Sequence, residues 1–169
     1  FELPDAEAFR AEITRSQSSA ENEIQKSLNK ARSLKDAIDE AEQKLKGKQS
    51  LDWQDKKMLE DLIEQRKNLD QAVKDLQEKN RMLEEKKDAF SEQNERIREK
   101  SEQIQKLMNE LLDPETKKLF EELEKMLKEN QDASQIQKML EKMDRQEINI
   151  EKELERTLEL FKQLQYDYK

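Results

Sequence analysis

The sequence predicts an all-α fold: an elongated antiparallel coiled coil, built as a long helical hairpin, with a short third helix and a long fourth helix packing on it as a bundle. Three observations predict this class. An apolar residue recurs at every seventh position over about fifty residues, which is typical of a coiled coil. Charged residues make up 44% of the chain and hydrophobic residues only 33%, too few for a globular core of ordinary size. One glycine and two prolines leave few turn residues for sheets. The apolar ladder consists of Leu62, Leu69, Leu76, Leu83, Phe90, Ile97, Ile104 and Leu111.

A first helix is predicted over residues 5–46. Pro4 and Asp5 suit the first turn, because proline needs no amide partner there and an acid favours the positive end of the helix dipole. Gly47, the only glycine, is expected to end this helix in a left-handed conformation. The inward positions are expected to be Phe9, Ile13, Ala20, Ile24, Leu28, Ala31, Leu34, Ile38, Ala41 and Leu45.

A second helix is predicted over residues 50–112, capped by Ser50. The loop before it is short, so the second helix should return antiparallel to the first and complete a hairpin. As one uninterrupted helix it would be a rod of about 90 Å. The apolar ladder occupies position d of its heptads and faces the packing seam.

Position a of the same heptads is polar through the middle of this helix. Asn80, Lys87, Asn94 and Ser101 follow one another there. A single buried Asn can fix the register of a coiled coil, which makes Asn80 and Asn94 candidates for register and specificity. Four polar positions in succession instead favour a seam that is partly exposed or flexible, and both interpretations stay open.

Two further helices are predicted in residues 113–169. Asp113 and Pro114 should end the second helix and start a short third one, and Asp132 with Gln135 has the spacing of a capping box for a long fourth helix. The inward positions of that fourth helix are apolar or aromatic except Glu147 and Thr157. The chain thus divides into a hairpin, 1–112, and a second unit, 113–169, which folds back on the hairpin or meets another chain.

The composition argues against catalysis. The chain has no histidine and no cysteine, so zinc sites, Ser-His-Asp nucleophiles and disulfides are excluded, and one glycine cannot build a phosphate-binding loop. Neighbouring carboxylates such as Glu84 and Glu85 point in different directions on a helix. We expect no enzyme activity, no cofactor, no metal site and no small-molecule ligand.

Charge and hydropathy also narrow the partners. The net charge is -8, and none of the three segments 1–46, 47–112 and 113–169 is positive, which disfavours nucleic-acid binding. No segment approaches about eighteen consecutive apolar residues, and the polar faces are not basic, so we expect no membrane contact by this segment. Because the chain starts at Phe1 without Met, we expect a fragment or processed product whose parent could carry membrane segments.

Trp53, the only tryptophan, falls at the start of the second helix. It either covers the end of the hairpin or anchors a protein partner, since exposed aromatic residues are enriched in binding hot spots.

Three stretches resemble a known family. They are LDWQDK at 51–56, ELLDPETKKL at 110–119 and LERTLELFKQL at 154–164. They resemble the coiled-coil portion of an uncharacterised family of large bacterial membrane-anchored proteins, a domain of unknown function. The resemblance covers most of residues 50–165 and implies a soluble helical stalk of a cell-envelope protein, with transmembrane helices outside this chain. It implies no catalytic residues.

Three hypotheses of function follow. The first is a structural and interaction module, a stalk or scaffold that self-associates or binds another protein. The second is a signal-transducing or ligand-sensing module whose polar seam, between Asn80 and Ser101, switches register. The third is a client-holding chaperone, which would expose apolar surface.

Overall fold

The computed structural model describes residues 3–90, 95–110, 114–129 and 132–167, with side chains except at positions 3–6, 9–10, 86–90, 95–98, 148 and 164–167. These ranges contain helices and no strand, so the all-α helical bundle predicted from the sequence is confirmed. The helices are α1 (Leu3–Leu45), α2 (Trp53–Phe90), α3 (Glu95–Glu110), α4 (Pro114–Lys128) and α5 (Ala133–Asp167).

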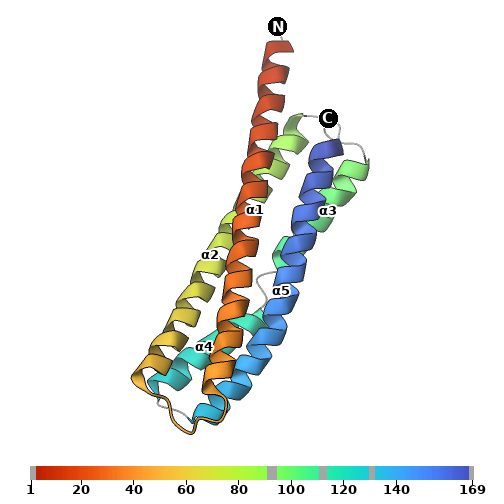
Figure 1. Ribbon diagram of the computed structural model, residues 1–169. Helices are drawn as coiled ribbons and strands as arrows, with labels where there is room; N and C mark the ends of the chain where they lie inside the picture. The colour runs from red at the N-terminus through yellow and green to blue at the C-terminus, as the bar shows by residue number, and fades with distance from the viewer. Residues whose placement is uncertain (1–2, 91–94, 111–113, 130–131, 168–169) are drawn as a thin grey trace.

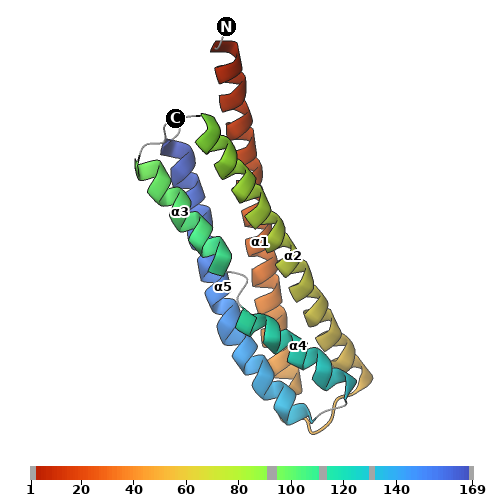
Figure 2. The ribbon, with the colours of Figure 1, turned by 180° about the vertical axis from the view of Figure 1, so that it is seen from behind.

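The helices form a bundle with four columns (Figure 1). Helices α1, α2 and α5 each fill one column, while α3 and α4 share the fourth, one above the other. Both short helices contact α2 on one side and α5 on the other. Figure 2 shows the same stacking from behind, with α4 crossing the lower end of the bundle obliquely. The chain direction alternates from column to column, and the first turns of α1 project beyond the other helices.

The predicted single helix over residues 50–112 is wrong. Helix α2 ends at Phe90, and α3 begins at Glu95 and runs the other way. Two hydrogen bonds fix this direction: Gln77 donates from Nε2 to the carbonyl of Met108 at 2.6 Å, and Asn80 donates from Nδ2 to Oε1 of Gln105 at 2.6 Å. As the residue number rises in α2, its partner's number falls in α3. The expected rod of about 90 Å is therefore replaced by a helical hairpin.

The first turn between helices follows the prediction in part. Gly47 has φ 81°, the left-handed conformation expected of a residue that ends a helix, and the amide of Lys48 bonds back to the Leu45 carbonyl at 3.0 Å. The cap of α2, however, is Asp52 and not Ser50. Its Oδ1 accepts the amide of Asp55 at 2.8 Å, and Asp55 Oδ2 accepts the amide of Asp52 at 3.1 Å. This reciprocal pair is a capping box formed by two aspartates.

The later helix boundaries agree with the sequence. Pro114 is the first residue of α4, and Asp132 caps α5. The Asp132 side chain accepts the amide of Ser134 on Oδ1 at 3.2 Å, whereas the amide of Gln135, the predicted partner in a capping box, bonds to the backbone carbonyl of Asp132 at 3.1 Å. Asp113, the predicted cap of α4, lies outside the described residues. Gln137 of α5 donates from Nε2 to the Leu45 carbonyl at the end of α1, which ties the start of α5 to the first turn.

One apolar core runs through the bundle. Most of the predicted ladder is in it, and the side chains of Phe90, Ile97 and Leu111 lie outside the described residues. Helix α5 folds back within its own chain and packs on α1, α3 and α4, which answers whether the fourth predicted helix needs another chain. The buried ladder residues are Leu62, Leu69, Leu76, Leu83 and Ile104, and α5 adds Ile136, Leu140, Met143, Ile150, Leu154 and Phe161.

Candidate functional site

The clearest chemistry in the structure is a buried ion pair between α2 and α5. Arg66 and Glu147 have exposed fractions of 2% and 0%, and Arg66 Nη1 donates to Glu147 Oε1. Arg66 Nε also donates to Asp70 Oδ1 at 2.8 Å, and its guanidinium lies 5.2 Å from the centre of the Phe120 ring of α4. The pair thus links α2, α4 and α5.

Glu147 is only half satisfied in this pair. Its second oxygen, Oε2, is buried and has no hydrogen-bond partner among the described residues. Burial raises the pKa of Glu147 to about 7, and the neighbouring Arg66 opposes this rise without cancelling it. A buried carboxyl with one free oxygen can hold a proton near neutral pH, which an exposed glutamate cannot.

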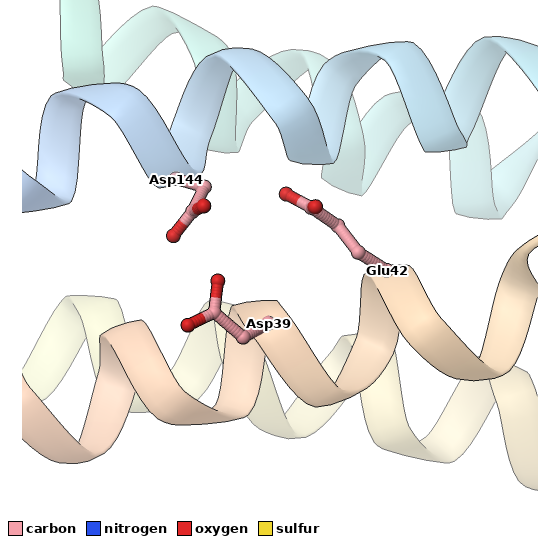
Figure 3. A group of neighbouring side chains, drawn as sticks. All are labelled: Asp39, Glu42 and Asp144. Atoms are coloured by element: carbon pink, nitrogen blue, oxygen red, sulfur yellow. The ribbon is translucent and has the colours of Figure 1, made fainter.

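A second acidic group lies on the facing sides of α1 and α5. Figure 3 shows Asp39 and Glu42 of α1 pointing toward Asp144 of α5. One oxygen from each carboxylate lies within 4.8 Å of the others, and all three side chains are half-buried. Glu42 Oε1 and Asp144 Oδ1 are buried without a hydrogen-bond partner among the described residues. We call Asp39, Glu42 and Asp144 the acidic cluster.

Proton affinity in the acidic cluster is raised. Burial, followed by a hydrogen bond with Asp39 and the charge of Asp39, raises the pKa of Asp144 to about 6. Burial and the charge of Asp144 raise the pKa of Glu42 as well. Within the described part of the chain, the cation in contact with the cluster is Lys35, whose Nζ lies 3.3 Å from Asp39 Oδ2. Three carboxylates with one lysine therefore favour sharing a proton, and carboxylate oxygens grouped in this way are also of the kind that hold a hard cation.

Around these groups, α5 is fastened to α1 at the surface. Arg32 donates from Nε to Glu151 at 3.1 Å and from Nη2 to Glu155 at 2.8 Å. Arg32 and Glu155 are about half exposed, so water screens this contact and it contributes little to stability.

Trp53 is exposed to solvent at the start of α2. Its exposed fraction is 71%, so it does not cover the hairpin end, and Lys57 Nζ lies 5.5 Å from the centre of its ring. At the same end of the bundle, residues on both sides of Trp53 in the sequence help to line a recess of about 280 Å³ between the α1–α2 turn and the end of α4. We call this end of the bundle, with residues 46–56 and the facing ends of α4 and α5, the Trp53 pole. The recess is lined by Gln49, Ser50, Leu51, Lys56, Met126, Leu127 and Asp132.

The polar residues predicted at position a do not lie along one continuous helix in this fold. Asn80 is buried and bonded to Gln105 of α3, while Asn94 lies outside the described residues. Ser101 is buried too, with Oγ unpartnered among the described residues. The polar positions flank the reversal between α2 and α3, so a register switch along one continuous helix has no such helix to act on.

The site residues predicted from sequence and those found here overlap little. The prediction gave the packing ladder, Asn80, Asn94 and Trp53; the structure adds the Arg66–Glu147 pair and the acidic cluster. Glu147 did carry a signal, as a charged residue on the inward face of its helix. The cluster carried none, because Asp39 and Asp144 belong to the first and last helices and each looks like solvated surface.

Comparisons of this chain with protein-family models, curated proteins and solved structures find no match. The resemblance to a membrane-anchored family therefore stays a prediction. Within the described residues, no helix is both long and apolar enough to cross a membrane.

Proposed function

We propose that this chain is a non-catalytic structural and interaction module that associates with a second copy of itself through the Trp53 pole. The observation that carries the proposal is the 71% exposure of Trp53, the more exposed of the two large hydrophobic side chains that lie at the surface of the described residues. A large aromatic side chain held at the start of a long helix loses little conformational freedom on binding, which suits an anchor residue.

The second copy is favoured by what lies beside Trp53. The recess lined by Leu51, Met126 and Leu127 is on the same pole as the tryptophan that could fill it. A two-fold symmetric contact requires a projection and its recess on one surface patch, since each copy offers both. Lys56 and Asp132 at the rim of the recess supply opposite charges for such a self-complementary contact.

The experiment is a concentration series in analytical ultracentrifugation, with the emission of Trp53 recorded in parallel. We expect the wild-type chain to dimerise and the emission to shift to shorter wavelength as the ring leaves water. Trp53→Ala should weaken the association at least about tenfold, the effect of losing a hot-spot residue. A wild-type chain that stays monomeric with unchanged emission contradicts the proposal.

Met82→Ala is the matched control for Trp53→Ala. Met82 is the other large hydrophobic residue found exposed in the described part, at 49%, and it lies next to Arg15 and Lys79, away from the Trp53 pole. This variant should associate as the wild type does. Loss of association in both variants would indicate non-specific hydrophobic contact, which is also what the chaperone hypothesis predicts.

The place of this module in a larger protein is a separate part of the proposal. The stretches 51–56, 110–119 and 154–164 resemble the stalk of a membrane-anchored envelope protein, and a bundle that completes its own core is suited to be a scaffold segment. Cell fractionation of the full-length protein, with this segment detected by antibody, tests it: the segment should follow the envelope fraction.

A further inference from the structure

The packing of α5 depends on carboxyl groups that are better buried neutral than charged. Glu147 is fully enclosed, and Oε1 accepts from Arg66 while Oε2 meets no donor among the described residues. An ionised carboxylate loses its hydration on burial, and one bonded oxygen recovers only part of that loss. With a proton on Oε2 the Arg66 contact is kept and most of the cost is removed.

A second carboxyl group that packs better neutral than charged lies one turn earlier on α5. Asp144 precedes Glu147 by three residues and faces Asp39 and Glu42 of α1 (Figure 3). Closing α5 onto α1 brings these carboxylates together, and a proton held between Asp39 and Asp144 relieves their repulsion. Opening the interface returns each group to water, where it ionises at an ordinary pH.

We propose that α5 is held against α1 and α2 by a proton-dependent lock, in which Glu147 and the Asp39–Asp144 pair bind protons when α5 packs and release them when it loosens. Helix α5 then docks more tightly at mildly acidic pH than at alkaline pH. The inference is independent of the Trp53 pole, because it concerns how the bundle closes on itself.

The neighbours of the lock come from each helix packed at this level. Helix α3 meets α5 nearer its carboxyl end, while α4 offers neutral groups here, the Phe120 ring and Thr116, which donates to Gln146. The charged and titratable groups that act on the lock are Arg66 and Asp70 of α2, Lys35, Asp39 and Glu42 of α1, and Glu141, Asp144 and Glu151 of α5.

The direction of the pH effect follows from the pKa values. Glu147 goes from an ordinary pKa of 4.5 to about 7 in the folded chain, and Asp144 from 3.8 to about 6. The folded state therefore binds more protons than the unfolded state between these values. Stability from the lock is complete below the lower values and is lost as pH rises through about 6 and 7. For each extra proton, the unfolding equilibrium constant rises about tenfold per pH unit.

The experiment measures proton binding and stability on the same chain, with a chelator present so that protons are the ligand. Carboxyl carbon NMR should show Glu147 titrating near pH 7 and Asp144 near pH 6. Denaturation between about pH 5 and 8 should give an unfolding constant that rises with pH up to about 7 and then levels off, and Glu147→Gln should reduce the slope below pH 7 by about one proton. Midpoints near the ordinary values, or equal slopes in variant and wild type, overturn the lock.

Glu64→Gln is the matched control. Glu64 lies exposed on α2, so its substitution removes the same charge without touching the lock and should leave the wild-type slope intact. A slope reduced equally in both variants would mean that overall charge, and not Glu147, sets the pH dependence, and would overturn the proposal.

A second variant and a distance measurement complete the test. If Glu147→Gln fails to fold, Asp144→Asn at the half-buried position should lower the slope in its place, and unchanged dependence there contradicts the lock. Spin labels at the exposed positions Ser33 of α1 and Lys152 of α5 report whether α5 itself moves. Their distance distribution should broaden from about pH 5.5 to 8 in the wild type, and a distribution independent of pH counts against the proposal.

Discussion

Helix α1 packs against two long partners, and the two interfaces are built differently. Towards α2 the facing side chains are mainly buried aliphatic residues, and an ion pair between the two helices, Lys79 with Glu23 at 3.9 Å, lies at the surface. Towards α5 the aliphatic packing is interrupted by the acidic cluster, and α2 reaches the same helix through Arg66 and Glu147. On the proposal above, the α1–α2 hairpin is a platform that does not respond to pH, while the docking of α5 depends on protonation.

Replacing Arg66 by Met should lower the free energy of unfolding the most, and it acts on the packing of α5. It leaves Glu147 buried without its cation, and breaking a buried pair costs about 3–5 kcal/mol of unfolding free energy. The cost should be largest near pH 8 and smaller near pH 5.5, where a proton neutralises Glu147. Denaturant titrations at both pH values measure it. The double variant Arg66→Met with Glu147→Met should recover most of the loss, and failure to recover would mean that the two residues act separately.

Replacing Leu69 by Ala disturbs the apolar core on the α2 side of the bundle. Leu69 is 1% exposed in α2, and losing a buried leucine of this kind costs about 2–5 kcal/mol through lost apolar burial and the cavity left behind. No proton is involved, so the loss should be the same at pH 5.5 and 8 in the same denaturant titration. The control is Glu64→Ala, an exposed change expected to stay within about 0.5 kcal/mol. A cost at Leu69 that varies with pH would remove the distinction between platform and conditional helix.

Replacing Asp52 by Ala should have the smallest effect on stability, and it tests how the start of α2 is capped. This variant removes the cap of α2 and should lower thermal stability by about 1 kcal/mol. Burial would raise the pKa of Asp55, but its bond to Lys48 holds that pKa below its ordinary value, so the turn stays charged over the range in which α5 responds. Ser50→Ala, the cap expected from sequence, is the control and should change little. Equal losses at both positions would contradict the capping box.

The sequence predicted most helix ends for physical reasons that the structure bears out. Gly47, Pro114 and Asp132 each have a backbone or capping property that few other residues share, so their positions are readable without a fold. The reversal between Phe90 and Glu95 was not predicted, because no glycine or proline marks it and the seven-residue ladder continues through it. The ladder continues because α2 and α3 face the same core. The polar positions Asn80 and Ser101 on either side were the available signal.

The sequence could indicate individual residues of the candidate site but not which of them meet in the fold. Glu147 stood out as a charged residue on the inward face of its helix, and Arg66 occupies position a of its heptad, where it was not singled out. Their pairing depends on the register of α2 against α5, which no local pattern encodes. Asp39 and Asp144 are ordinary helix-surface residues until α5 packs on α1, and the raised pKa of Asp144 is a property of that contact.

The positions of the start of α1 and the end of α5 determine how the bundle responds to a pulling force. Helix α1 begins and α5 finishes at the pole opposite Trp53, as Figure 1 shows. A load applied between those two points peels the helices apart sideways instead of stretching them lengthwise. Peeling breaks contacts one turn at a time, first Arg32 with Glu155 and later Asp39 with Asp144. The force needed for the later step should therefore be tunable by acidity, while the α1–α2 hairpin remains intact.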